Sequence, residues 1–99
     1  MEYSKAILPD RLLRDIIESA RKTSVEKVIL FGSRARRTNS ERSDVDLAVK
    51  GGDFDGFYRE ITENSYSLLM FDIVNLSSGI SEELQKEIDK DGVLLYEKV

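Results

Sequence analysis

The sequence of 99 residues contains neither cysteine nor histidine. Without cysteine the chain forms no disulfides and has no thiolate chemistry, which favours a reducing cytoplasm as its location. Without histidine, Ser-His-Asp and Cys-His nucleophile pairs are excluded and a zinc site is disfavoured. Any catalysis must therefore depend on carboxylates, hydroxyls, lysine, arginine or a hard metal ion.

Long apolar runs are also missing. No stretch approaches the ~20 apolar residues that a membrane-spanning helix needs. The first ten residues lack the basic-then-apolar order of a signal peptide, so we expect no leader and no membrane association. Hydrophobic residues make up 40% of the chain and charged residues 34%, a composition typical of soluble globular proteins. A chain of this length has room for one core, and we expect a single domain over residues 1–99.

The net charge is unevenly distributed along the chain. The net charge of −4 argues against a general nucleic-acid binder, which would need a basic face to neutralise phosphates. Residues 33–43, however, contain four arginines and one glutamate, a net +3 that leaves −7 on the remainder. One short basic loop in an acidic protein indicates a small anionic ligand rather than a nucleic acid.

Apolar spacing and turn residues predict helices that alternate with strands. A first helix starts at Pro9 and Asp10 and ends near Lys22, with one apolar stripe along it. Strands are expected at 25–32, 44–50, 67–76 and 93–97, a brief helical turn after Ser33, and helices opening at Asp53 and Ser81. This order predicts an α/β (α+β) fold with a small mixed or antiparallel sheet and helices mainly on one face.

Three carboxylates lie where two of these strands could bring them together. Asp44 and Asp46 are two residues apart on one strand, so their side chains emerge on the same face. Asp72 lies in the middle of an apolar run, where an unpaired buried charge would be costly, so we expect a partner that offsets its desolvation. If the two strands are neighbours, the three carboxylates converge as ligands suited to Mg²⁺ or Mn²⁺. The simpler alternative places Asp44 and Asp46 on a solvent face and pairs Asp72 with an arginine.

A possible phosphate-binding element precedes them. Gly32 and Ser33 end one strand and enter a short helix, a place with free backbone N–H groups, a hydroxyl and room for close approach of a phosphate. Arg36 and Arg37 follow on the same helical face as Ser33 and could grip phosphate oxygens, whereas Arg34 is expected to point elsewhere. The simpler alternative is a plain turn, and the segment is not a P-loop.

The spacing of these residues resembles the minimal nucleotidyltransferases of the DNA polymerase beta-like superfamily, which includes kanamycin nucleotidyltransferase. Gly32-Ser33, ten intervening residues and then Asp44-Val45-Asp46 match the family pattern G-S-x10-D-x-D, with Asp72 on a later strand. The resemblance extends over nearly the whole chain, including the first helix and the closing helix and strand. It therefore implies the nucleotidyltransferase fold.

The resemblance also implies a role for each residue. Gly32 and Ser33 would bind the triphosphate, and Asp44 and Asp46 would coordinate two Mg²⁺ ions. Asp72 would complete the second metal site and help deprotonate an acceptor hydroxyl. Attack on the α-phosphate would then transfer a nucleoside monophosphate, with AMP from ATP favoured, and release pyrophosphate. Two metal ions stabilise the attacking and leaving oxygens, so this chemistry needs no histidine.

Small stand-alone members of this family resemble the antitoxin half of two-protein systems. Their partner is an all-helical HEPN-domain ribonuclease toxin, and some are thought to adenylylate a tyrosine on it. The resemblance thus implies a protein adenylyltransferase with a HEPN-domain partner. Two alternatives stay open, namely a catalytically idle nucleotide-binding antitoxin that acts by complex formation, and a transferase for a small-molecule hydroxyl such as an aminoglycoside. The second is less favoured, because 99 residues leave little room for an enclosing acceptor pocket.

Overall fold

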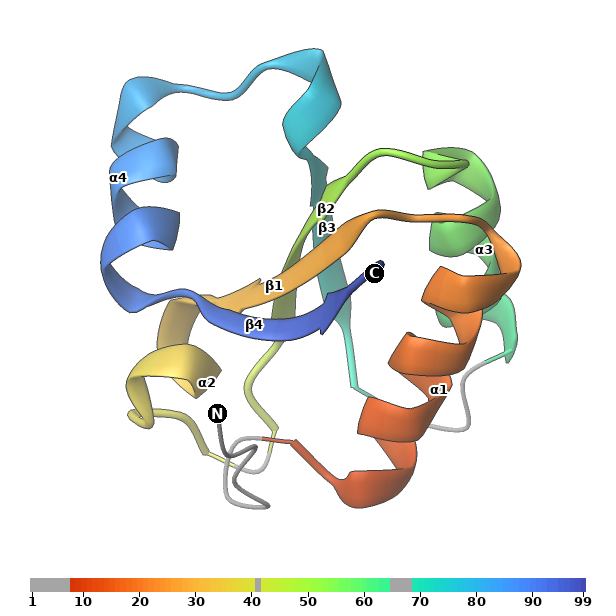
Figure 1. Ribbon diagram of the computed structural model, residues 1–99. Helices are drawn as coiled ribbons and strands as arrows, with labels where there is room; N and C mark the ends of the chain where they lie inside the picture. The colour runs from red at the N-terminus through yellow and green to blue at the C-terminus, as the bar shows by residue number, and fades with distance from the viewer. Residues whose placement is uncertain (1–7, 41, 65–68) are drawn as a thin grey trace.

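The computed structural model describes residues 8–40, 42–64 and 69–99. The elements, in chain order, are α1 (Asp10–Lys22), β1 (Lys27–Phe31), α2 (Gly32–Arg36), β2 (Val45–Lys50), α3 (Phe54–Asn64), β3 (Phe71–Asn75), the 3-10 helix η1 (Leu76–Ser78), α4 (Glu82–Asp91) and β4 (Val93–Glu97) (Figure 1). The predicted order of helices and strands is confirmed. Residues 67 and 68 of the predicted third strand lie outside the described residues. No described helix is both long and apolar enough to cross a membrane.

The four strands form one mixed sheet, as the sequence predicted, and their order in the sheet is β3-β2-β1-β4. β1 runs antiparallel to both β2 and β4, and β2 runs parallel to β3. The parallel pair is joined through α3, the kind of crossover that parallel strands require. As a result, the end of β1 and the starts of β2 and β3 meet at the same end of the sheet.

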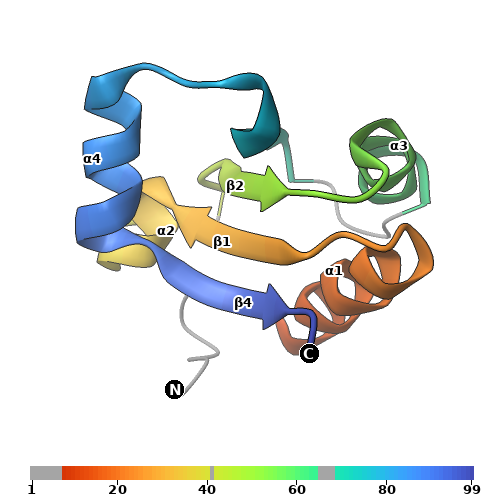
Figure 2. The ribbon, with the colours of Figure 1, turned by 45° about the horizontal axis from the view of Figure 1, so that its top comes forward.

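The main core lies on one face of the sheet, where α1 and α3 pack side by side (Figure 2). Leu12 and Ile16 from α1, and Phe57 and Ile61 from α3, are almost completely buried. Each such side chain contributes about 1.5–3 kcal/mol when it leaves water. The alternating β2 residues Val45, Leu47 and Val49 supply the sheet side of this core, as their spacing predicted. The prediction of helices mainly on one face is confirmed for α1 and α3.

The opposite face is covered in part by α4. A smaller cluster there contains Phe31, Ala48 and Ile88, with half-buried neighbours around it. Ala48 is fully buried, so this face of β2 is covered at Ala48, whereas Asp44 on the same face is exposed. The physical reason is that Ile88 of α4 packs in one buried cluster with Phe31 of β1 and Ala48 of β2. α4 thereby lies beside the end of the sheet where β1 stops.

Side-chain caps fix where two helices begin. The Asp53 carboxylate Oδ1 accepts a hydrogen bond from the Gly56 N–H at 3.0 Å, before the first turn of α3. The Ser81 hydroxyl Oγ accepts one from the Leu84 N–H at 3.2 Å at the start of α4. Both predicted helix starts are confirmed, and each cap typically contributes about 1 kcal/mol.

Candidate functional site

The predicted site residues meet at one end of the sheet. In the register of the strands, Asp46 lies opposite Phe31 on one side and opposite Asp72 on the other. A hollow of about 650 Å³ opens there. Six of the seven predicted site residues line it, namely Gly32, Ser33, Arg36, Asp44, Asp46 and Asp72. The sheet thus brings together groups that are up to forty positions apart in the sequence, from Gly32 to Asp72.

Gly32 allows the backbone to pass close to Asp46. Its φ of +77° lies in the left-handed region, which residues other than glycine rarely adopt. A Cβ atom at this position would also overlap Oδ2 of Asp46. α2 begins at Gly32 itself, two residues earlier than the helical turn that was predicted to follow Ser33. The glycine is therefore required both by the backbone conformation and by the position of the Asp46 carboxylate.

Arg34 connects the two sides of the site. The residue is 3% exposed, and its Nε donates a hydrogen bond to the Ser43 carbonyl oxygen at 3.0 Å. Burial lowers the pKa of its guanidinium, whose usual value lies far above neutrality. The prediction that Arg34 points away from the phosphate-binding side is confirmed. Because Ser43 immediately precedes Asp44, this bond fixes the start of β2 relative to α2.

The other two arginines of α2 lie differently. Arg36 lines the hollow, and its Nη1 lies 3.6 Å from Oε1 of Glu87 and 3.8 Å from Oδ2 of Asp91 on α4. Arg37 is the C-terminal cap of α2, with a left-handed φ of 64°, and its side chain does not line the hollow. Of the two arginines that the sequence left open, Arg36 is the one placed beside the carboxylates.

Asp46 lies in a strongly negative environment. Burial raises the pKa of its half-buried carboxyl to about 6, and the carboxylates of Asp72, Asp44 and Glu87 add to this rise. Arg36 acts in the opposite direction. A carboxylate surrounded in this way is stabilised by any cation that binds next to it. Within the described ranges, no three acidic side chains lie close enough together to hold a metal ion by themselves. A bound ion would therefore need further oxygen ligands, such as those of a phosphate.

The predicted burial of Asp72 is wrong. The sequence placed it mid-strand in an apolar run and predicted a partner that offsets its burial. β3 is instead an edge strand, and the Asp72 side chain is exposed to solvent. No desolvation cost has to be offset, because this side chain stays in solvent at the edge of the sheet. Its strand is the sheet neighbour of the strand of Asp46, which is the condition under which the carboxylates were expected to converge.

Sequence reasoning missed two charged residues at this site. Arg42 lines the hollow from the loop before β2, and Glu87 lines it from α4. Arg42 could have been found, since it lies in the basic segment two residues before Asp44. Glu87 carries no local signal, because only the packing of α4 against the sheet brings it to the site.

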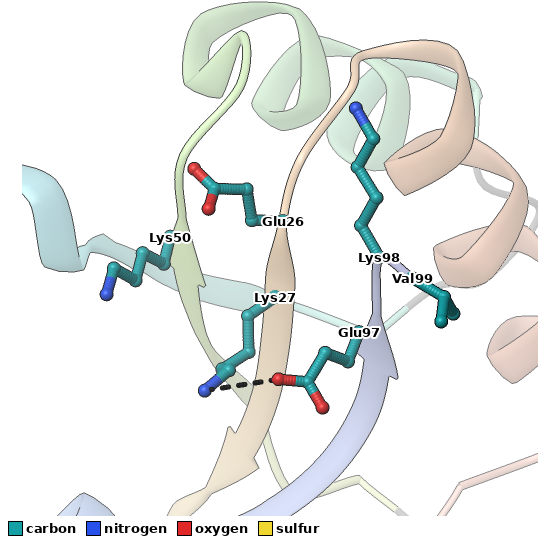
Figure 3. Close-up of a pocket in the computed structure, with 6 residues that line it drawn as sticks. All are labelled: Glu26, Lys27, Lys50, Glu97, Lys98 and Val99. Carbon is teal, nitrogen blue, oxygen red and sulfur yellow. Dashed lines mark ion pairs between the residues drawn. The ribbon is translucent and has the colours of Figure 1, made fainter.

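A second hollow, of about 460 Å³, lies at the other end of the sheet (Figure 3). It is lined by Glu26, Lys27, Lys50, Glu97, Lys98 and Val99. Lys27 and Glu97 point toward each other, with 3.5 Å between Nζ and Oε2. Its charges are of both signs and come from the start of β1 and the ends of β2 and β4. This hollow is thus separate from the carboxylate site, and we assign it no chemistry.

The comparisons with known proteins agree with this geometry. The sequence profile described as "Polymerase beta, Nucleotidyltransferase" matches residues 14–99. The chain therefore belongs to the polymerase beta nucleotidyltransferase family, as its G-S and D-x-D spacing predicted. A protein of Methanocaldococcus jannaschii with the provisional name protein adenylyltransferase is 33% identical over 90 residues. That match covers 91% of this chain and 80% of the relative.

Solved structures show the same fold. A toxin–antitoxin crystal structure with AMP-PNP superimposes with a TM-score of 0.69 at 24% identity, over 87% of this chain and 73% of the other. A mutant MntA–HpeT toxin–antitoxin structure gives 0.68 at 22% identity over the same shares. A nucleotidyltransferase structure from Sulfolobus solfataricus gives 0.52 at 22% identity, over 99% of this chain and 93% of that one. The predicted nucleotidyltransferase fold is confirmed.

Proposed function

We propose that this chain transfers AMP from ATP to a hydroxyl group of a partner protein, with Mg²⁺ or Mn²⁺ bound in the carboxylate site. The observation that carries the proposal is the register of the sheet, which sets Asp46 between the Gly32 end of β1 and Asp72. The adenylyltransferase name of the archaeal relative supports the transferred group. AMP-PNP, an ATP analogue, is named with one toxin–antitoxin structure of this fold, which supports ATP as the donor.

The residues of α2 would bind the triphosphate. Gly32 has no Cβ and allows close approach of phosphate oxygens to its backbone, and Ser33 adds a hydroxyl donor. Arg36 lies in the same hollow and would neutralise part of the phosphate charge. Arg42, which the sequence reasoning missed, is a further cation at the rim. Arg37 is not placed to contribute directly.

The donor set fits a hard divalent cation, which nucleotidyltransferases of this fold generally use. Asp44 and Asp46 are adjacent carboxylates beside the triphosphate position, and Mg²⁺ is commonly held by one or two carboxylates together with substrate phosphates. The raised pKa of Asp46, about 6, marks a carboxylate that gains from a bound cation. When bound, such ions would neutralise charge on the attacking and leaving oxygens. Two ions would require Asp72 as an additional ligand.

The chemistry is an in-line displacement at the α-phosphorus. The acceptor oxygen forms a bond to this phosphorus, the bond to the bridging oxygen breaks, and pyrophosphate leaves. The acceptor proton would pass to a carboxylate, and Asp72 is suited to this because its exposed side chain lies at the open edge of the sheet. Asp44 and Asp46 would hold the cations, and Arg36 and Ser33 would keep the triphosphate in line.

The acceptor would lie on another protein molecule. Both toxin–antitoxin structures share the fold of this chain, and we propose a toxin with a HEPN domain as its partner, with this chain as the antitoxin. The carboxylate hollow is bordered by exposed residues such as Asp44 and Arg42, so it can face a second macromolecule. A tyrosine hydroxyl of the partner is the acceptor that the family resemblance favours.

A labelling experiment tests this function. The chain, Mg²⁺ and the protein encoded next to it are incubated with ATP labelled at the α-phosphate, and with ATP labelled at the γ-phosphate as control. The partner should carry label only from the α-phosphate. Asp44→Asn and Asp46→Asn should abolish labelling without lowering the melting temperature. A stable complex that inactivates the toxin with no labelling by any of the four nucleotides would instead establish an idle antitoxin. Labelling of an aminoglycoside rather than the partner would establish the small-molecule alternative.

A further inference from the structure

α4 reaches the nucleotide site through two ion pairs with one arginine. Arg36 Nη1 lies 3.6 Å from Oε1 of Glu87 and 3.8 Å from Oδ2 of Asp91. Glu87 and Asp91 are four residues apart, so they occupy the same face of α4 one turn from each other. Glu87 itself lines the hollow with Arg36 and Ser33, whereas Asp91 does not. The guanidinium is therefore held from the α4 side at the border of the hollow.

Both ion pairs use the same nitrogen. In both, the contact given is made by Nη1, which leaves Nε and Nη2 as the opposite edge of the guanidinium. This edge of the guanidinium can still donate two parallel hydrogen bonds to a phosphate group, the strongest arrangement that arginine offers. An arginine side chain has many rotamers, and ordering it costs conformational entropy. A side chain that is already held through Nη1 loses less of that entropy when it binds a phosphate.

Glu87 also has an unfavourable effect on nucleotide binding, which opposes the benefit of orienting Arg36. Its negative charge lines the same hollow as the triphosphate position and repels phosphate oxygens. A carboxylate with no role in orienting Arg36 would therefore only weaken nucleotide binding. The sign of the change when Glu87 loses its charge thus distinguishes orientation from repulsion.

We propose that Glu87, supported by Asp91, is a positioning residue that orients Arg36 for the triphosphate, so that α4 forms part of the nucleotide site. The inference rests on the proposed function in one respect, that a nucleoside triphosphate binds in this hollow. It adds that the affinity for the nucleotide depends on α4, through a contact that the sequence pattern of the family site does not contain.

The test is a double-mutant cycle on the full chain. The dissociation constant for AMP-PNP with Mg²⁺ is measured by calorimetry for the wild type, Glu87→Gln, Arg36→Ala and the double variant. The buffer is set at pH 8, above the pKa of about 6 that Asp46 has in the wild type. Glu87→Gln should weaken binding about two- to fivefold, the range expected from a half-exposed ion pair. In the Arg36→Ala background the same change should cause no weakening.

The controls separate positioning from general effects of charge and stability. Glu83→Gln removes the same charge one turn earlier on α4, at an exposed position outside the hollow, and should leave the dissociation constant within twofold of the wild type. Asp91→Asn should weaken binding in the same direction as Glu87→Gln, though less. In the transfer reaction, Glu87→Gln should raise KM for ATP and leave kcat unchanged, a pattern that a merely destabilised chain would not give.

Two outcomes would overturn the inference by itself. The first is binding by Glu87→Gln that is as tight as in the wild type, or tighter. The second is equal weakening with and without Arg36, which would mean that Glu87 acts by another route. A wild-type chain that binds no AMP-PNP with Mg²⁺ would overturn the proposed function as well.

Discussion

The contact between Gly32 and Asp46 leads to a prediction that separates stability from activity. In Gly32→Ala, the new Cβ would occupy the space of Asp46 Oδ2 and would also come within 3.0 Å of its Cγ. The Asp46 carboxylate lies at the end of a side chain, so it can rotate away at little cost to folding. It would then leave the position at which it can hold a cation. We therefore expect a large loss of activity, with a loss of stability no greater than the strained backbone alone would cause.

Gly79 supplies a matched control. Its φ is +86°, close to the +77° of Gly32, but a Cβ added there meets nothing within 4 Å. Each alanine should cost about 1–3 kcal/mol of unfolding free energy because the backbone is held in a region unfavourable to side chains. For a chain of this size, 1 kcal/mol corresponds to a fall of roughly 4–8 °C in Tm. Both variants should thus melt at similar temperatures, roughly 4–24 °C below that of the wild type.

Activity should divide the two variants. A displacement of about 1 Å in a catalytic group can cost roughly a hundredfold in rate, so Gly32→Ala should lose about this factor in AMP transfer. Gly79→Ala should stay within twofold of the wild type when assayed well below its Tm. If both variants keep wild-type activity, the close contact with Asp46 has no role in catalysis. If both lose the same fraction of activity, backbone strain alone explains the effect.

Three other predictions concern charges around the site. The pKa of Asp46 rises from 3.8 to about 6 on folding, so its charged form destabilises the fold as pH rises from 4 to 6. Asp46→Asn should therefore raise the unfolding free energy at pH 7 by on the order of 1 kcal/mol. Paired thermal melts of the variant and the wild type should show that this gain vanishes near pH 4. Arg34→Met should lower the unfolding free energy in urea by about 1–3 kcal/mol, because the Ser43 carbonyl loses a buried charged donor; a change below about 0.5 kcal/mol would contradict this role. Arg36→Ala should weaken AMP-PNP binding about tenfold or more, whereas Arg37→Ala should leave it within twofold. Comparable effects of the two alanines would contradict the placement of Arg36.

Much of the fold could be predicted because its signals are local. The spacing of Leu12 and Ile16 marks a helix, and the alternation of Val45, Leu47 and Val49 marks a half-covered strand; both lie where expected. The G-S and D-x-D spacing likewise identified the family, because it is the number of residues that connect the end of β1 to the start of β2.

What could not be predicted depends on tertiary position. An apolar run with one aspartate is the same in sequence whether its strand is central or at an edge, so the exposure of Asp72 was missed. The burial of Ala48 and the approach of Glu87 to Arg36 both follow from where α4 packs, which no local pattern encodes. The choice between Arg36 and Arg37 likewise required the actual end of α2.

The buried bond between Arg34 and Ser43 makes the site mechanically asymmetric. It joins α2, whose residues we propose to bind the triphosphate, to the start of β2, so we expect these two walls of the site to keep their relative position. The third wall is α4, in which only Ile88 of its ten residues is buried. We therefore expect α4 to be the most mobile side of the site. We expect this helix to shift outward when pyrophosphate leaves and ATP enters, and then to return.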